Sequence, residues 1–169
     1  MSDSFVAIIM GSDSDLPLLE NTMGILDNFG IPYEVRVASA HRTPDVVSQY
    51  VSDAEKRGCA VFIGAAGLAA HLAGAIAART TRPVIGIPCD GGPMNGLDAL
   101  YSTVEMPGGI PVATVAVGKA GAKNAAYLAA QIIALTDPAV DEKVKADRRK
   151  AAEEVMKKDA MLQERISSK

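Results

Sequence analysis

The sequence predicts an α/β fold, in which a parallel sheet of five strands is covered by helices and followed by a C-terminal helical extension. Three observations carry this prediction. Five apolar-rich runs recur along the chain, each run is followed by a turn of small or polar residues, and each turn by a helical stretch. Strands that alternate with helices form parallel sheets through right-handed crossovers. A chain of 169 residues with 49% apolar and 22% charged residues suits one domain with a real core.

The first expected strand is "FVAIIM", a continuous apolar run that is typical of a strand buried on both faces. The other four runs follow at intervals that leave room for a helix. The five expected strands are residues 5–10, 33–38, 59–64, 83–88 and 111–117.

Helical stretches fill the intervals between the strands. The first ends at Gly30, and the second begins at Thr43-Pro44, where proline suits the first turn of a helix, and ends at Gly58. The remaining expected helices are an alanine-rich stretch at 69–78, a stretch from about 97 to 104, and residues 122–137.

Two segments have an unusual content of charged residues. Residues 59–78 contain no charged side chain, but twelve of the twenty are Ala or Gly, so we expect a strand, a turn and a helix rather than a membrane span. Residues 137–169 hold nearly half of the chain's charged side chains, of both signs. We therefore divide the chain into a single α/β domain, 1–136, and a charged helical extension, 137–169, that is solvated or lies over a neighbouring subunit.

The composition argues against several classes of function. A net charge of −3 is unsuited to a broad nucleic-acid surface, and 4% aromatic residues supply few stacking platforms. The two cysteines, Cys59 and Cys89, have no metal-binding spacing, so we expect no metal. The first residues are acidic where a signal peptide is basic, and we expect a cytoplasmic protein with no membrane partner.

The candidate chemistry lies in the turns after the strands, because ligands bind beyond the carboxyl ends of an open parallel sheet. In "GSDSD", Gly11 permits a sharp turn, Ser12 and Ser14 offer hydroxyls to a phosphate, and Asp15 can accept hydrogen bonds from ribose. A plain N-cap explains these residues equally well from this motif alone.

The second turn, "SAHRTP", has the strongest functional signal. Helix initiation explains Thr43 and Pro44 but leaves Ser39, His41 and Arg42 unexplained. Arg42 can bind a phosphate through two donors. His41 is a natural proton carrier near neutral pH.

The third turn, "AAGLAAHLAG", offers mainly backbone. Its small residues, Gly67 among them, would let N–H groups approach a ligand closely, although tight packing of a helix on the sheet explains the alanines as well. His71 is the only side chain in this turn with acid–base chemistry, and on its own it is more often structural.

The segments "MGSDSD", "SAHRTP", "AAHLAG" and "LYSTVEMPGGIPVATVAVGKAGAKNAA" together resemble the PurE family of purine biosynthesis, in particular its class I branch. The resemblance runs from about Phe5 to Ala134. It implies a three-layer Rossmann-like (flavodoxin-like) fold and a homo-octamer. It also implies an isomerase that moves a carboxylate from the exocyclic nitrogen to carbon 4 of an aminoimidazole ribonucleotide, with no cofactor.

By motif match, the resemblance assigns a role to most of the candidate residues. Ser12, Asp15, Ser39 and Arg42 would bind the ribose phosphate end of the substrate. His41 would be the acid–base residue. The third turn, with Gly67 and His71, would lie near the imidazole and the carboxylate.

Two alternatives stay open. The class II branch carboxylates aminoimidazole ribonucleotide directly with CO2, and a non-catalytic nucleotide-binding module would share the same sheet without needing His41. Class I members usually have glycine at the position of Leu68 and proline at that of Ala73. Leucine takes a positive φ only at a cost, so we expect the backbone at Leu68 to be either ordinary or strained.

Overall fold

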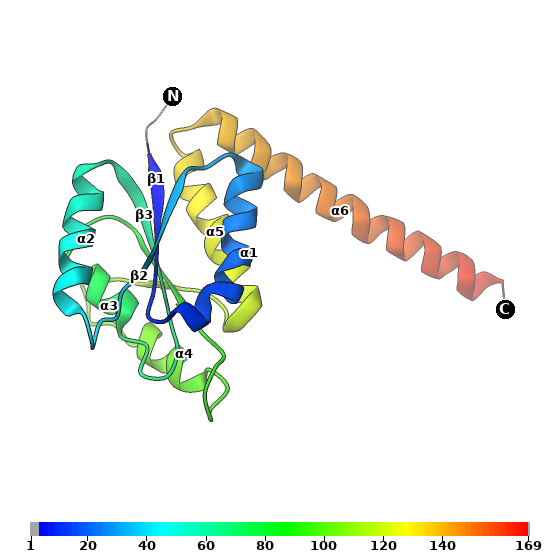
Figure 1. Ribbon diagram of the computed structural model, residues 1–169. Helices are drawn as coiled ribbons and strands as arrows, with labels where there is room; N and C mark the ends of the chain where they lie inside the picture. The colour runs from blue at the N-terminus through cyan, green and yellow to red at the C-terminus, as the bar shows by residue number, and fades with distance from the viewer. Residues whose placement is uncertain (1–3, 169) are drawn as a thin grey trace.

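The computed structural model describes residues 4–168 and contains one sheet of five parallel strands in the order β2-β1-β3-β4-β5 (Figure 1). The strand bounds are β1 Phe5–Met10, β2 Tyr33–Val37, β3 Cys59–Ala66, β4 Val84–Pro88 and β5 Ala113–Thr114. The prediction of a five-stranded parallel sheet is confirmed. In this order β2 and β3 lie on opposite sides of β1, which places the switch point between β1 and β3, and a ligand crevice is expected there.

Helices cover both faces of the sheet, so the molecule has the three layers of a flavodoxin-like fold (Figure 1). On one face lie α1 and α5, which pack on each other, and on the other face lie α2, α3 and α4. The bounds are α1 Leu16–Phe29, α2 Pro44–Lys56, α3 Leu72–Ala77, α4 Leu97–Val104, α5 Gly118–Ala134 and α6 Pro138–Ser167, with a short 3-10 helix at Asp13–Asp15.

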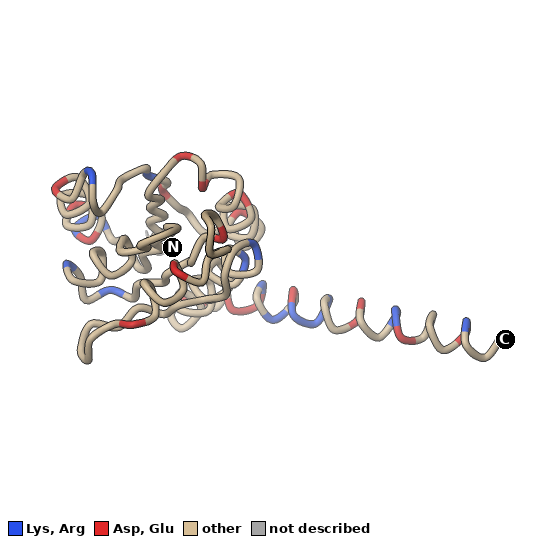
Figure 2. The backbone as a smooth tube through the Cα atoms, turned by 90° about the horizontal axis from the view of Figure 1, so that it is seen from below, with Lys and Arg blue, Asp and Glu red and all other residues tan. Residues whose placement is uncertain are grey.

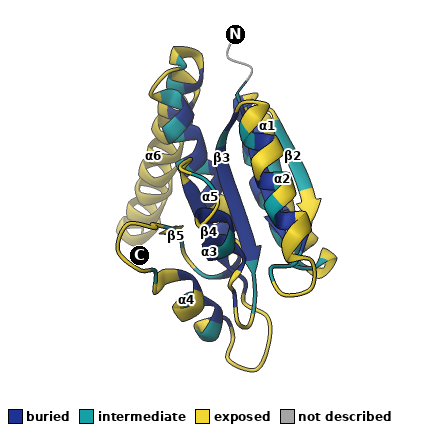
Figure 3. Ribbon diagram, turned by 90° about the vertical axis from the view of Figure 1, so that its left-hand side faces the viewer, coloured by how far each residue is buried: buried dark blue, intermediate teal, exposed yellow. Residues whose placement is uncertain are grey.

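Alternation along β1 divides the interior into two cores. Val6, Ile8 and Met10 face the core beneath α1 and α5, whereas Ala7 and Ile9 face the core beneath α2 and α3. All five side chains are buried, as are the central strands in Figure 3. A strand buried on both faces must be apolar throughout, which explains why "FVAIIM" has no polar position.

Two elements are shorter than the sequence suggested. β5 has only two residues, although 111–117 is an apolar-rich run, because only Ala113 and Thr114 pair with β4. The alanine-rich helix expected at 69–78 begins only at Leu72 as α3, because residues 68–71 form tight turns instead.

The charged tail forms one helix, α6, which runs away from the body (Figures 1 and 2). The carboxylate of Asp137 caps its start by accepting hydrogen bonds from the backbone N–H groups of Ala139 and Val140. Only Val140 and Val144 of this helix are buried, both within the core beneath α1 and α5. Asp141 and Asp147 are half-buried and the rest of α6 is exposed, with Lys, Arg, Asp and Glu spaced along its length (Figure 2).

The uncharged segment 59–78 folds as the strand β3, a turn and the helix α3. Within residues 4–168, no helix has the length and apolar character needed to cross a membrane. The expectation of strand, turn and helix for this segment is confirmed.

Candidate active site

The loops that follow β1, β2, β3 and β4 surround a cavity of about 510 Å³ at the carboxyl edge of the sheet. The cavity lies at the switch point between β1 and β3, where the topology favours ligand binding. Every site residue expected from the sequence lines this cavity. These residues are Ser12, Asp15, Ser39, His41, Arg42, Gly67 and His71.

The loop after β1 supplies hydroxyls and a carboxylate. The Ser12 hydroxyl caps the 3-10 helix by accepting from the Ser14 N–H at 3.3 Å, and it also accepts from the Ser14 hydroxyl at 2.8 Å. The capping interpretation of "GSDSD" therefore holds for Ser12 at the 3-10 helix but not for Asp15, which makes no side-chain capping hydrogen bond at the start of α1. Both serines remain at the cavity wall. Burial raises the pKa of Asp15, although a hydrogen bond from Cys89 partly opposes this shift.

The loop after β2 is held by its own hydrogen bonds. The Ser39 N–H donates to the Thr43 hydroxyl at 2.9 Å, and the Thr43 N–H donates to the Ser39 carbonyl at 2.9 Å. The Ser39 hydroxyl accepts from the Arg42 N–H at 3.2 Å. α2 then begins at Pro44, as expected, so the segment that carries His41 is anchored at both ends.

Arg42 joins the second loop to the first. Its Nη2 donates to the carbonyl oxygen of Gly11 at 2.9 Å, which holds the guanidinium beside Ser12 and Ser14 at the cavity wall. The other guanidinium donors can take a phosphate oxygen, since an Arg fork has five N–H groups. Two serine hydroxyls and this guanidinium form a group that is suited to a phosphate monoester.

The two histidines meet across the cavity. The ring centroids of His41 and His71 are 5.4 Å apart, with the ring planes tilted by 52°. Both side chains are exposed to the cavity. His71 directly precedes α3, so the loops after β2 and β3 bring the only two imidazoles of the chain to one place.

The loops after β3 and β4 lie against each other. The Cys89 N–H donates to the Ala66 carbonyl at 2.9 Å, and a Cβ at Gly67 would lie 3.6 Å from that of Cys89. Leu68 has a φ of +56°, so its backbone is strained rather than ordinary. The left-handed conformation costs a residue of this kind about 1–2 kcal/mol.

The sequence reasoning missed Cys89 as a cavity residue. Its thiol is buried, and burial together with the neighbouring carboxylate of Asp15 raises its pKa to about 12. At neutral pH the thiol is therefore a hydrogen-bond donor and not a nucleophile. Its place directly after the strand at 83–88 was the available signal, but a lone cysteine resembles a core residue.

The fold and the cavity define a class of protein: an open α/β sheet with a cavity at its switch point that contains a histidine pair and donors suited to a phosphate. A family model described as AIR carboxylase matches residues 5–154. The chain belongs to the AIR carboxylase family, which confirms the resemblance to PurE.

Similar proteins agree with this assignment. The chain is 50% identical over 159 residues to the N5-carboxyaminoimidazole ribonucleotide mutase of Thermotoga maritima, covering 94% of this chain and 92% of that protein. It is also 50% identical over 153 residues to the mutase of Pseudomonas aeruginosa, covering 90% and 94%. The crystal structure of Treponema denticola PurE superposes with a TM-score of 0.85 at 33% identity, over 94% of this chain and 98% of that one.

Proposed function

We propose that this chain is an N5-carboxyaminoimidazole ribonucleotide mutase. The observation that carries the proposal is the meeting of His41, His71 and Arg42 in one cavity of a chain half identical to proteins named as such mutases. The phosphate of the ribonucleotide binds Arg42 and the serine hydroxyls, and the half-buried carboxylate of Asp15 accepts hydrogen bonds from the ribose. The aminoimidazole then reaches toward the histidines.

The reaction needs one proton carrier, and we assign this role to His41. As an imidazolium it donates a proton to the exocyclic nitrogen. The bond from that nitrogen to the carboxyl carbon then breaks, the electron pair of this bond stays on nitrogen, and CO2 is released. The amine then pushes electrons into the ring, and carbon 4 bonds to the CO2 carbon. Neutral His41 finally removes the proton from carbon 4, which restores both the ring and the imidazolium.

The other cavity residues have supporting roles in this proposal. His71 lies beside His41, close enough to contact the aminoimidazole ring of the substrate or the carboxylate that is being transferred. Gly67 and its small neighbours line the cavity with backbone and methyl groups. An apolar wall of this kind limits the escape of CO2 and keeps water away from it.

The experiment that tests the function compares two substrates on the purified protein. A mutase converts the carbamate ribonucleotide to the 4-carboxy product without added bicarbonate. A direct carboxylase of the class II type instead forms this product from aminoimidazole ribonucleotide and bicarbonate. Rapid turnover of the second pair alone contradicts the mutase proposal, and binding without any turnover favours a non-catalytic nucleotide-binding module.

We also propose that the chain works as a homo-oligomer, an octamer by family resemblance, with α6 on a second copy. Apolar residues recur eleven residues apart on α6, as two sets: Val140, Ala151 and Leu162, and Val144, Val155 and Ile166. The first residue of each set is buried in its own chain, whereas the others are exposed. The exposed residues continue the stripe that packs on the body, so a second copy of this chain is the matching occupant. A monomer in light scattering at micromolar concentration contradicts this proposal.

The remaining expectations are part of the same proposal. The catalytic unit is 1–136, to which the first turns of α6 pack, and 137–169 is its helical extension. The two free and buried thiols, Cys59 and Cys89, fit a reducing cytoplasm. The mutase reaction as written uses neither a metal nor an organic cofactor.

A further inference from the structure

The loops after β3 and β4 meet along three consecutive contacts, here called the β3–β4 seam. At its base the Cys89 N–H donates to the Ala66 carbonyl at 2.9 Å. In the middle Gly67 lies against Cys89, where an added Cβ would come within 3.6 Å of the Cys89 Cβ. At the cavity mouth Leu68 covers Gly92, since a Cβ at Gly92 would lie 2.5 Å from the Leu68 Cδ2. The first two contacts involve buried or half-buried residues, and the third closes the seam where it reaches solvent.

Leu68 is unfavourable in two ways. It holds a left-handed backbone with a φ of +56°, which leucine adopts only at a cost in free energy. It also leaves 54% of its surface exposed, although it is a large apolar residue. Strained residues of this kind cluster at functional sites, where the strain serves the mechanism.

The turn at Leu68 also sets the position of His71. The Ala70 N–H donates to the Leu68 carbonyl at 2.8 Å, and the His71 N–H donates to the Ala69 carbonyl at 2.7 Å. These two tight turns run without a break from Leu68 into the histidine. The Leu68 side chain on Gly92 is the contact that fastens the start of this segment to the neighbouring loop.

Gly92 allows this contact because it has no side chain. Its φ is +87°, and any side chain there would meet the Leu68 Cδ2. Both residues line the cavity, together with His41 and His71. The apolar cover is therefore part of the wall, at its solvent side, of the cavity that also contains both histidines.

We propose that Leu68 is a positioning residue that closes the β3–β4 seam over Gly92, so that the CO2 released from nitrogen is kept until carbon 4 bonds to it. This proposal rests on the proposed function. In the productive path the nitrogen–carbon bond breaks and the carbon–carbon bond forms within the closed cavity. In the failed path the nitrogen keeps the proton from His41, CO2 escapes, and aminoimidazole ribonucleotide is released. The ratio of the two products measures how well the seam closes.

The test follows both products from the carbamate ribonucleotide, after subtraction of its decay without protein. Leu68→Ala keeps the strained left-handed backbone and removes the apolar side chain that covers Gly92. Leu68→Gly removes both the strain and the side chain. Leu68→Met keeps a long apolar side chain. Leu97→Ala is the matched control, because Leu97 is also an exposed leucine, 44% exposed, but does not line the cavity.

We expect the decarboxylated share of product to rise about tenfold in Leu68→Ala and in Leu68→Gly, since loss of positioning costs one to two powers of ten. Leu68→Met and Leu97→Ala should keep the wild-type ratio. A loss of folded protein alone lowers both products equally and leaves the ratio unchanged, so the ratio reports closure rather than stability.

Two results would overturn the proposal. One is an unchanged product ratio in Leu68→Ala in an otherwise active enzyme. The other is a wild-type ratio in Leu68→Gly with a disturbed ratio in Leu68→Ala, which would assign the effect to backbone strain instead of the side chain. Failure of the wild-type protein to convert the carbamate at all overturns the proposed function, and is distinguishable from both.

Discussion

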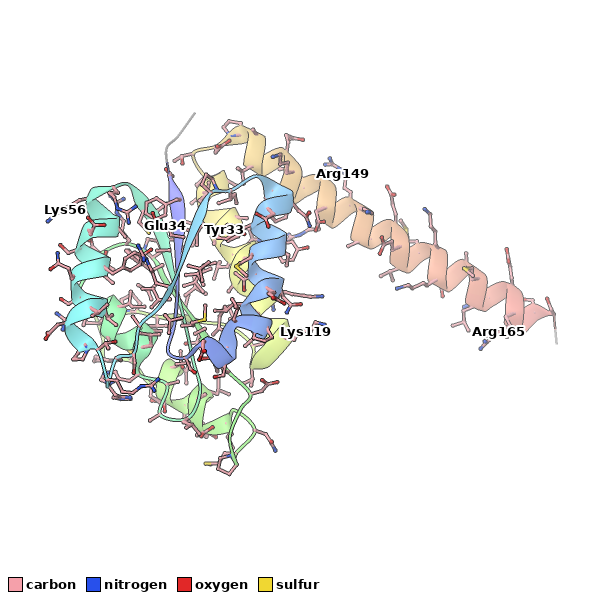
Figure 4. The ribbon with its side chains drawn as sticks, viewed as in Figure 1. Tyr33, Glu34, Lys56, Lys119, Arg149 and Arg165 are labelled. Carbon is pink, nitrogen blue, oxygen red and sulfur yellow. The ribbon has the colours of Figure 1, made fainter. Side chains whose placement is uncertain are left out.

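The consecutive helices α5 and α6 are built in opposite ways. α5 is rich in Gly and Ala, and eight of its residues are buried against the sheet and α1. α6 is nearly twice as long but buries only Val140 and Val144 (Figure 3). Its side chains stand away from the helix along its length, as Arg149 and Arg165 do in Figure 4. Small residues let α5 lie close to its neighbours, whereas most of α6 has no partner within residues 4–168.

The packing within a single chain fixes the position of α5 but not the direction of most of α6. The position of α5 follows from close packing, which tolerates little change in volume. The direction of α6 beyond Asp147 is set by the helix itself, because the hydrogen bond from the Tyr127 hydroxyl to the Asp147 carboxylate, at 2.7 Å, is among the last contacts that hold α6 to the body. In the candidate site, His41, Arg42 and His71 are exposed as most of α6 is, but they stand on loops that the packed body holds in place.

The largest expected effect on stability is that of Gly121→Ala in α5. An added Cβ would overlap the backbone carbonyl oxygen of Ala116, and a backbone atom cannot move aside as a flexible side chain can. We expect a loss of more than about 4 kcal/mol in the free energy of unfolding, in the exceptional range for one substitution. Urea denaturation measures it. Gly24→Ala in α1 is the matched control, because nothing lies within 4 Å of its added Cβ, and it should stabilise the protein by roughly 0.5–1 kcal/mol.

Arg42→Ala should alter binding and leave the fold intact. Arg42 is exposed, and its side chain donates one hydrogen bond, to the Gly11 carbonyl. Loss of a charged hydrogen bond to the substrate phosphate should weaken binding by about 1.5–3 kcal/mol. The effect should appear in KM with kcat nearly unchanged, because the phosphate does not react. Arg42→Lys keeps the charge and should recover part of the affinity. An unchanged KM in Arg42→Ala would remove this residue from the phosphate site.

Val144→Ala and Val155→Ala compare equivalent positions on α6, eleven residues apart. Val144 is 8% exposed and Val155 is 65% exposed. Val144→Ala should lower the free energy of unfolding by about 1–2 kcal/mol, since two buried methyl groups are lost. Val155→Ala should change the stability of the separate chain by less than about 0.5 kcal/mol.

If α6 packs on a second copy, association of the copies raises the thermal midpoint of unfolding as the protein concentration rises. Val155→Ala should then make this rise smaller. Thermal unfolding at several protein concentrations measures this. Equal effects of the two substitutions in dilute, dissociated protein would contradict the contrast between the two halves of α6.

The smallest effect is expected at the surface of β2, where Glu34 pairs with Arg57 (Figure 4 labels Glu34). The hydrogen bonds from Arg57 and then from Tyr50 hold the pKa of Glu34 below its ordinary value of 4.5, against the opposing effect of burial. A lowered pKa in the folded state means that the pair stabilises the protein above pH 4.5 and stops doing so as the pH falls through the lower folded value.

Glu34→Gln should therefore be slightly less stable than wild type at pH 7, and the difference should disappear in acid. The effect should be small because the Glu34 side chain is 33% exposed and solvent screens the pair. Urea midpoints at pH 7 and pH 3 measure it. A difference that grows on acidification would contradict the assigned sign.

The sequence predicted the body well because buried strands leave a strong pattern. "FVAIIM" and the turns after the strands identified the parallel sheet and its ligand edge. β5 was overestimated because Val112 and Val115 lie outside the two-residue strand and are apolar because they pack against the two cores. Backbone pairing at the edge of a sheet leaves no signal in hydrophobicity alone.

The candidate site was predictable where polar residues had no structural explanation. His41 and Arg42 were in that position, and both line the cavity. Cys89 was not, because a buried thiol looks like a core residue. From the sequence, the backbone at Leu68 could be predicted only as either ordinary or strained, because its contact with Gly92 joins residues from different loops.

We propose that the packed body holds His41 in place as the proton carrier. The most direct test is His41→Asn, with turnover of the carbamate ribonucleotide measured by absorbance and affinity for the 4-carboxy product measured by calorimetry. Asparagine keeps the size and some hydrogen bonding but cannot change protonation state. We expect turnover to fall by about 10⁴-fold, the upper end for general acid–base groups, with product affinity and unfolding free energy retained. A fall of less than about tenfold, or a joint loss of turnover and product binding, would contradict the claim.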